Sequence, residues 1–315
     1  MTQPRAVRVE LPHDDLRIRF AADETIVFAS SSGHCNLDCT YCVVHPVVKH
    51  QPSLTYEDLR FIIDRVGGKL FFIFSGAGDF FAGYRPRDRL LARLLEHDNV
   101  RVALDVNGVA VHCIDVLSTE QLAKIAQVNL TFHYRQLEKH RALDVWRRNA
   151  ELLLNRCLDS DLFITYILSP SERCTWSEGM EWYGRHIYGP LGKPVVLIND
   201  VDRPFAAEDE AALAELRARY GQLICDVRRG DFASVLSSFD KVLCPAGQSY
   251  FRVWNDGRIE SCPNVETLRD AGNAKQRAMG LRSEPFECRD VRHCDCYHIA
   301  SAGRMTFLID ELRKG

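Results

Sequence analysis

The sequence lacks several features that would define a class of protein at once. No stretch of its 315 residues approaches the ~20 apolar residues that a membrane-spanning helix needs. The opening residues 1–5 are not followed by the apolar core of a secretory signal. Charge of one sign is not in excess, because 40 basic and 43 acidic residues are interleaved and the formal net charge is −3. We therefore expect a cytoplasmic protein with no membrane and no nucleic-acid partner.

Cysteine, by contrast, is abundant, with 12 in the chain. A cysteine-rich sequence without a secretory signal favours metal binding over disulfides, because the cytoplasm keeps thiols reduced. One group of cysteines lies near the N-terminus and a second lies in the last quarter of the chain. Four others stand singly and are expected to be small buried hydrophobic residues: Cys113, Cys157, Cys174 and Cys225.

The first group is Cys35, Cys39 and Cys42, in C-x3-C-x2-C spacing with Tyr41 before the last cysteine. Three thiolates at this spacing fit three irons of a 4Fe–4S cluster and leave the fourth iron without a protein ligand. The pattern resembles the cluster loop of the radical S-adenosylmethionine (SAM) enzymes. The resemblance implies that the open iron binds SAM, with Tyr41 in the cofactor site. It also implies that one electron then splits SAM to give a 5′-deoxyadenosyl radical.

The same cysteines also allow a zinc site. Cys39 and Cys42 form a C-x2-C pair, and His34 or His45 could join Cys35 to complete a Cys3His set. The triple spacing and the rest of the chain favour the cluster.

Beyond residue 24, apolar segments alternate with amphipathic helical segments. Six strands are predicted, at 26–30, 69–75, 101–106, 128–134, 162–168 and 194–199. Helices are predicted at 55–66, 86–97, 118–127, 137–157, 176–187 and 207–223. Near-continuous apolar strands separated by helices indicate a parallel sheet covered by helices. We predict an α/β fold, an open partial (β/α)6 barrel. Its first strand leads directly into the cysteine loop, where such barrels carry their chemistry.

The second predicted strand ends in a glycine-rich turn that contains Gly76, Ala77, Gly78 and Asp79. Glycine at a strand end lets backbone groups approach a ligand closely, although such a turn is often only a tight connection. The turn resembles the Gly-Gly-Glu segment that contacts SAM in the radical SAM family. Ala77 and Asp79 replace the usual Gly and Glu, and Phe80 replaces Pro, so the resemblance implies backbone contacts more strongly than a role for the Asp79 carboxylate.

Two further strands end in polar residues. Asn107 follows the third strand and resembles the family's Thr-Asn-Gly end, which is also typical of a turn. Alternation along the fourth strand places Thr131 and His133 on one face, opposite Phe132 and Tyr134. If that face points into the barrel, Thr131 and His133 could hold the ribose of SAM or the substrate. A histidine in a buried strand is otherwise a satisfied core residue.

The second cysteine group follows the barrel. Cys244 and Cys262 bracket an Asn-Asp-Gly hairpin signal. This segment resembles the opening of the twitch and SPASM domains, which hold auxiliary iron–sulfur clusters. The resemblance implies one auxiliary 4Fe–4S cluster with Cys244, Cys262, Cys294 and Cys296 as ligands, and Cys288 as the spare thiol. A zinc ribbon is the alternative.

The chain is therefore expected to have three parts. Residues 1–24 form an N-terminal extension, 25–235 the partial barrel, and 236–315 a twitch-like domain. The last part is predicted to contain the β-hairpin and a closing helix at 305–313.

The resemblance implies a radical SAM enzyme that removes a hydrogen atom from its substrate. The extension 1–24 is short for a domain that binds peptide leaders, which favours a small molecule such as a sugar, aminocyclitol or nucleoside, in natural-product biosynthesis. The expected reaction is either a dehydrogenation or an epimerisation. In an epimerisation, Cys288 would be the hydrogen donor. A lyase or decarboxylase reaction stays open. A flavodoxin- or ferredoxin-type protein would supply the electron. The alternatives are a maturase that modifies a peptide or protein side chain and a zinc-stabilised binding module.

Overall fold

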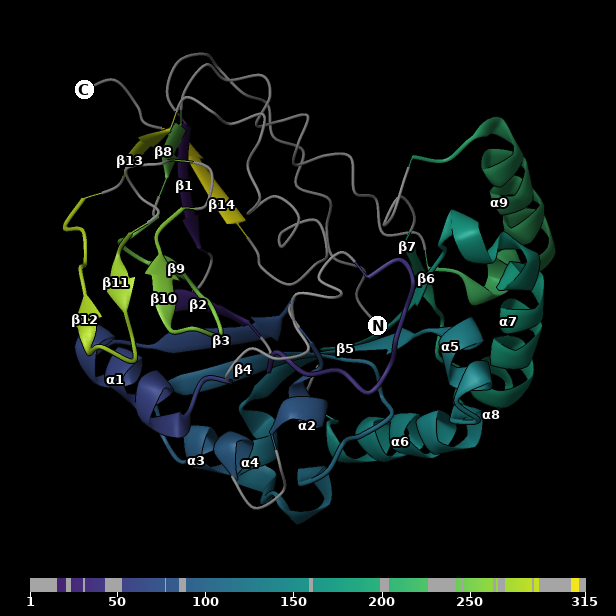
Figure 1. Cartoon of the computed structure of the whole chain (residues 1–315), viewed down its shortest axis with the longest axis horizontal. Coiled ribbons are helices and arrows are strands. Elements are labelled where there is room, and N and C mark those ends of the chain that lie inside the picture. Colours follow the sequence, from purple (N-terminus) through teal and green to yellow (C-terminus); the bar gives the residue numbers. More distant parts are fainter. Residues whose placement is uncertain are drawn as a thin grey trace.

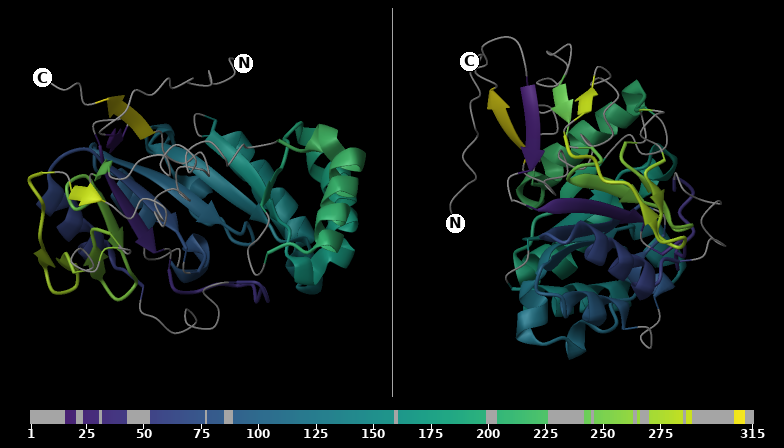
Figure 2. Two further views of the ribbon diagram at one scale, coloured as in Figure 1. Left: turned by 90° about the horizontal axis from the view of Figure 1, so that it is seen from above. Right: turned by 90° about the vertical axis from the view of Figure 1, so that its left-hand side faces the viewer.

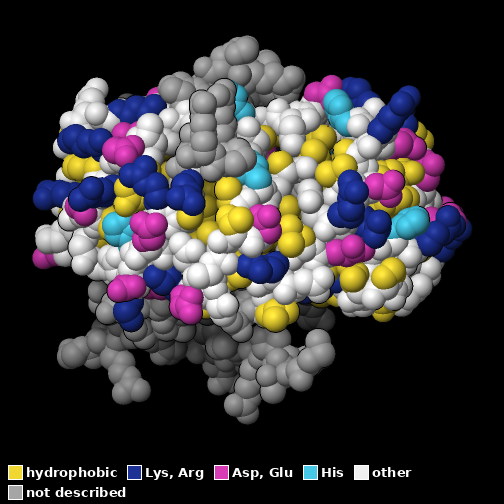
Figure 3. All heavy atoms as spheres, turned by 90° about the horizontal axis from the view of Figure 1, so that it is seen from below, with side chains coloured by type: hydrophobic (Ala, Val, Ile, Leu, Met, Phe, Trp, Pro, Cys, Tyr) yellow, Lys and Arg dark blue, Asp and Glu magenta, His cyan; other side chains and the backbone are white. Residues whose placement is uncertain are grey.

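A computed structural model describes most of the chain. The residues it describes are 16–20, 24–30, 32–42, 53–76, 78–84, 89–158, 161–198, 204–225, 242–244, 246–262, 265, 270–284, 286–288 and 307–311. Among them, no helix is both long and apolar enough to cross a membrane. On the face at the bottom of Figure 1, side chains of both charge signs occur among hydrophobic ones, in keeping with the balanced composition (Figure 3).

The fold is built on a curved sheet of parallel strands (Figure 1). In spatial order these strands are β2 (Thr25–Ser30), β3 (Leu70–Ser75), β4 (Val100–Val106), β5 (Ile125–Phe132), β6 (Asp161–Ile167) and β7 (Val196–Ile198). Each pairs in parallel with the next. Within the described residues the sheet is open, since β7 ends one side and a short strand far along the chain ends the other. The predicted α/β open partial barrel is confirmed.

Helices cover the outer face of this sheet (Figure 1). They are α1 (Tyr56–Val66), α2 (Phe80–Gly83), α3 (Leu90–Leu95), α4 (Thr119–Ala123), α5 (Tyr134–Lys139), α6 (Leu143–Arg156), α7 (Trp176–Tyr183), α8 (Gly189–Leu191) and α9 (Ala207–Tyr220). Alternate strand residues such as Phe72, Leu104 and Leu130 pack against them in one large core. The opposite, concave face carries a smaller apolar cluster that includes Phe28 and Ile73.

Local signals explain where α1 begins and ends. The Thr55 hydroxyl accepts a hydrogen bond from the Asp58 N–H, and the Asp58 carboxylate accepts one from the Thr55 N–H, so a capping box is present. The helix ends at Gly67, whose φ of 74° suits a residue without a Cβ.

The C-terminal strands extend the same sheet. The hairpin β9 (Tyr250–Val253) and β10 (Arg258–Glu260) is followed by β11 (Gly272–Asn273) and β12 (Ala278–Met279). Strand β9 pairs in parallel with β2, so the predicted hairpin adds to the barrel's first edge. This group and α9 lie at opposite ends of the molecule in Figures 1 and 2.

A second sheet joins distant parts of the sequence. Its order is β13 (Phe286–Cys288), β8 (Val242–Cys244), β1 (Leu16–Phe20) and β14 (Phe307–Glu311). The closing helix predicted at 305–313 is therefore wrong over 307–311, which forms a strand antiparallel to β1. The apolar run Phe-Leu-Ile suits either structure, and the pairing partner almost 300 residues earlier decides between them.

Three helix boundaries also differ from the prediction. The helix predicted at 137–157 is two helices, α5 and α6, separated near Arg141, whose φ is 52°. The helix predicted to reach 127 ends at Ala123, because Ile125 already pairs with Val102 on β4. Helix α3 begins at Leu90, and residues 86–88 of the helix predicted at 86–97 lie outside the described part of the chain.

Candidate functional site

The cysteine loop leaves the carboxyl end of β2, as predicted. Cys39 is buried, Cys42 is half-buried and Cys35 is exposed. The loop is anchored by a small apolar cluster in which Leu37, Cys39 and Tyr41 pack together. The Cys42 N–H donates to the Cys39 carbonyl at 3.2 Å, which closes the last turn of the loop.

The Cys35 sulfur accepts two hydrogen bonds, whereas burial acts against the anionic form of the loop thiols. Two N–H groups donate to Cys35 Sγ at 3.5 Å, one from the Leu37 backbone and one from the Asn107 side chain. Such donors stabilise a thiolate or a cluster sulfur. Desolvation of the sulfur by the protein around it raises the pKa of the Cys35 thiol, although the residue as a whole is exposed, and burial raises the pKa of the Cys39 thiol to about 12. Metal binding at this loop must therefore displace protons.

The described residues contain no group of three or more His, Cys, Asp or Glu side chains arranged to hold a single metal ion. Neither the three loop cysteines alone nor these cysteines together with His34 form such a group, and His45 lies outside the described residues.

His133 reaches the cysteine loop from the end of β5. Its Nδ1 lies 2.7 Å from the Tyr41 hydroxyl and 3.7 Å from Cys39 Sγ. The two rings are stacked, with centroids 6.0 Å apart and planes 23° apart. Burial lowers the pKa of His133 to about 4, so the imidazole is neutral at pH 7. His133 therefore supports the middle of the loop through Tyr41.

Asp79 joins the glycine turn to the next strand end. One carboxylate oxygen accepts the Ala82 N–H at 3.0 Å, and the other accepts the Asn107 N–H at 2.6 Å. The Asp79 N–H donates to the His34 carbonyl at 2.6 Å, which connects the turn to the cysteine loop. The side chain is 2% exposed, and burial raises its pKa to about 6. Asp79 therefore connects three loops, two through its carboxylate and the cysteine loop through its backbone N–H.

The glycine turn is close to the cysteine loop. A Cβ on Gly78 would lie 2.4 Å from the His34 carbonyl oxygen, and its φ is 89°. Gly76 has a similar φ of 87° but no atom within 4 Å of such a Cβ. Ala77 lies outside the described residues. Only glycine fits at Gly78, because the two loops touch there.

Thr131 lies on the concave face of the sheet and is half-buried. The Thr165 hydroxyl, which has a single hydrogen to donate, lies 3.4 Å from the Thr131 hydroxyl and 3.1 Å from Asn129 Oδ1. Thr131 is therefore part of a polar group that faces away from the helices.

The C-terminal cysteines are only partly described. Cys244 ends β8 in the four-stranded sheet, and Cys262 follows β10 in the ten-stranded sheet, both half-buried. Cys288 ends β13, where it pairs with Val242. Cys294 and Cys296 lie outside the described residues.

The four cysteines outside the two groups differ in their exposure to solvent. Cys157 is buried, as expected, and Cys113 is half-buried. The expectation is wrong for Cys174 and Cys225, which are exposed. Cys174 lies in the short 3-10 helix Pro170–Thr175 and Cys225 follows the short 3-10 helix Gly221–Leu223, and an isolated cysteine in such a segment does not indicate burial.

Two residues of the concave face, Ser75 and Asp105, were not predicted as site residues from the sequence. Ser75 donates its hydroxyl hydrogen to the Asp105 carboxylate, across the last pair of positions on β3 and β4. Each is the polar residue near the end of an otherwise apolar strand, and that pattern is the signal that could have found them.

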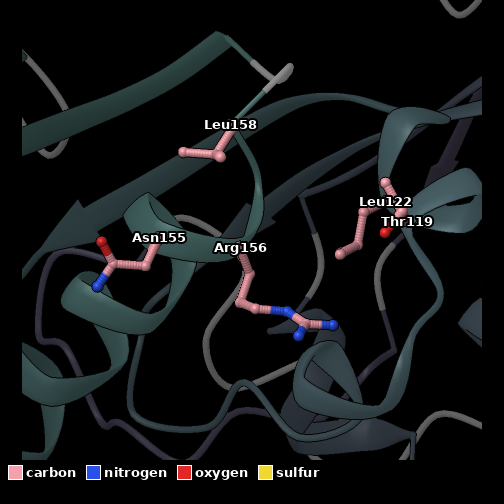
Figure 4. Close-up of a pocket in the computed structure, with 5 residues that line it drawn as sticks. All are labelled: Thr119, Leu122, Asn155, Arg156 and Leu158. Atoms are coloured by element: carbon pink, nitrogen blue, oxygen red, sulfur yellow. The ribbon is translucent and has the colours of Figure 1, made fainter.

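A pocket of about 230 Å3 lies elsewhere on the molecule (Figure 4). Its lining residues are Thr119, Leu122, Asn155, Arg156 and Leu158. They precede β5 and β6, so the pocket lies at the amino edge of the parallel sheet. The cysteine loop follows β2 at the carboxyl edge, and this pocket is separate from the candidate site.

Solved structures with a similar fold exist. The radical SAM enzyme anSMEcpe with bound S-adenosylmethionine (AdoMet) matches at a TM-score of 0.51 and 16% identity, over 87% of this chain and 82% of that one. The chain has the fold of a radical SAM enzyme.

Weaker similarity extends to two other structures. SuiB from Streptococcus suis gives a TM-score of 0.45 at 12% identity, over 88% of this chain and 67% of that one. BtrN in complex with AdoMet and 2-DOIA gives 0.33 at 13%, over 89% and 85%. No protein-family model and no curated protein matches the sequence.

Proposed function

We propose that this protein is a radical SAM enzyme. The observation that carries the proposal is the C-x3-C-x2-C loop, which directly follows the first strand of an open parallel sheet with this fold. Cys35, Cys39 and Cys42 would hold a 4Fe–4S cluster, and SAM would bind at the iron that lacks a thiolate. When bound, the cluster and SAM supply a 5′-deoxyadenosyl radical. The AdoMet bound in anSMEcpe supports this cofactor choice.

The residues around the loop have distinct tasks in this proposal. Gly76 and Gly78 present backbone groups to SAM from the turn beside the cysteine loop. Asp79 acts as a positioning residue, because both of its oxygens already accept backbone N–H groups. Asn107 donates to Cys35 Sγ and so supports the cluster sulfur.

Thr131 on β5 and His133 directly after that strand would contribute to the cofactor site. His133 positions Tyr41 through the hydrogen bond at 2.7 Å. The buried strands and helices exclude water, which protects a reactive radical from side reactions.

We further propose that the substrate is a small molecule. Residues of the C-terminal region would convert the substrate radical to the product, either by accepting an electron or by donating a hydrogen atom. Cys244, Cys262, Cys294 and Cys296 would hold an auxiliary 4Fe–4S cluster that accepts an electron, giving net dehydrogenation. Cys288 would donate a hydrogen atom if the reaction is an epimerisation. A flavodoxin- or ferredoxin-type protein would reduce the first cluster.

Anaerobic reconstitution tests the proposal. The protein should hold about eight irons, four in each cluster, and after chemical reduction it should convert SAM to 5′-deoxyadenosine. Cys42→Ala should abolish this cleavage, whereas Cys174→Ala, which removes an exposed single cysteine, should not. A protein that binds only zinc, or a Cys42→Ala variant that still cleaves SAM, would overturn the assignment.

A further inference from the structure

A row of polar side chains crosses the concave face of the sheet at one level. Ser30 on β2 pairs with Ser75 on β3, Ser75 donates to Asp105 on β4, and Asp105 pairs with Asn129 on β5. The residues just before them, such as Phe74 and Leu104, belong to the core under the helices. Because successive side chains in a strand alternate between faces, the whole row points away from the helices.

The row continues onto the C-terminal hairpin. Val253 on β9 pairs with Ala29, so Trp254 follows at the level of Ser30. Arg252 lies one step below, with its guanidinium 4.1 Å from the centre of the Trp254 ring. In the described part of the chain, neither the buried Trp254 Nε1 nor the buried Arg252 Nε has a hydrogen-bond partner.

Buried donors without partners cost stability, and folded proteins rarely retain them unless a ligand or water completes them. These two donors lie at one end of the polar row, and the Asp105 carboxylate lies near its centre. The row thus offers donors at one end, a carboxylate in the middle and an amide beyond it. It lies directly below the cysteine loop, because all these strands end at the same edge.

We propose that this row, formed by Ser30, Ser75, Asp105, Asn129, Arg252 and Trp254, binds the substrate, and that the substrate is a polyhydroxylated amine. Adjacent strands are about 4.8 Å apart, a spacing that hydroxyl groups of one sugar-like ring can bridge. The half-buried Asp105 accepts hydrogen bonds from hydroxyl or ammonium groups and disfavours a phosphate at its position. Glu260 lies opposite Arg252 across the hairpin, where its carboxylate is paired with Arg258 at 2.9 Å, and it adds a second acidic group at that end of the row. This inference rests on the proposed function.

Three hexoses of graded charge provide the probe: glucosamine, glucose and glucose 6-phosphate. Binding to the reconstituted protein in the presence of SAM is measured by calorimetry at millimolar sugar. Glucosamine should bind best and glucose 6-phosphate worst. Asp105→Asn should weaken glucosamine about tenfold, the loss of one charge-assisted hydrogen bond, and should change glucose by less than about twofold.

Controls separate this inference from the proposed function. Asp115→Asn removes an exposed carboxylate outside the row and should leave all three affinities unchanged. Should Asp105→Asn fail to fold, Ser75→Ala removes the donor to the same carboxylate and should weaken glucosamine selectively. The inference is overturned if none of the sugars binds, if glucose 6-phosphate binds best, or if the row variants leave glucosamine unaffected. SAM cleavage and iron content, measured on the same samples, report independently on the proposed function.

Discussion

Replacing Asp79 by asparagine should change the pH dependence of stability in a direction that the structure determines. The carboxyl group is buried and its pKa is raised from 3.8 to about 6, mainly by desolvation. The folded protein therefore binds this proton more tightly than the unfolded chain does. Its stabilising contribution is complete below about pH 4 and is lost as the pH rises to about 6.

The size of the effect follows from two opposing contributions. A shift of roughly two units at about 1.4 kcal/mol per unit destabilises the wild-type protein by about 3 kcal/mol above the folded pKa. Asparagine does not titrate, but it offers one acceptor oxygen where the carboxylate offers two. Either the Ala82 or the Asn107 N–H then loses its partner, at a cost of about 1–3 kcal/mol at every pH. Asp79→Asn should be less stable than wild type near pH 4 and equal or more stable near pH 7.

Urea unfolding of the metal-free proteins, followed by circular dichroism across this pH range, measures the difference. Ser32→Ala is the matched control, because it removes the hydrogen bond from the Ser32 hydroxyl to the Asp79 carbonyl at 2.7 Å and keeps the titrating carboxyl group. Its deficit should not depend on pH. The quantity to follow is the difference in free energy of unfolding between Asp79→Asn and wild type. If this difference varies by less than about 1 kcal/mol between pH 4 and pH 7, which is close to the error of such extrapolations, the reasoning is refuted.

Further variants test the contacts around the loop. Gly78→Ala places a Cβ 2.4 Å from the His34 carbonyl oxygen, whereas Gly76→Ala has a similar positive φ and no clash. The melting temperature of Gly78→Ala should therefore be the lower of the two. Equal melting temperatures would contradict the close approach of the two loops. Tyr41→Phe and His133→Phe should each destabilise the protein by about 1–3 kcal/mol, and in unfolding experiments their double variant should lose less than the sum, because both break the same hydrogen bond; additivity would count against that bond. Cys262→Ala should lose about half of its iron and still cleave SAM, whereas Cys288→Ala should keep its iron; colorimetric iron assays decide, and the reverse pattern would exchange the two assignments.

Features of the candidate site that depend only on residues close to one another in the sequence could be predicted from it. The cysteine spacing and the apolar strand before it lie within 20 residues, so their relation is visible without a structure. The Thr55 and Asp58 capping box is similarly local. The strand β14 could not be predicted, because its apolar residues suit a helix equally well until β1 supplies a partner. The role of Asp79 is also non-local, since it depends on an N–H group 28 residues away.

The polar row shows why register is the decisive missing quantity. Ser30, Ser75 and Asp105 lie at or next to the end of their strands and Asn129 lies in the middle of β5, so none of them stands out when its strand is considered alone. A shift of one residue in any single strand would turn its member toward the helices and replace it with an apolar side chain. The observed pairing instead aligns all four on the concave face, beside the loop that carries Cys35, Cys39 and Cys42. The helix side of the sheet is thereby kept apolar, and the polar row lies on the side that we propose binds the substrate.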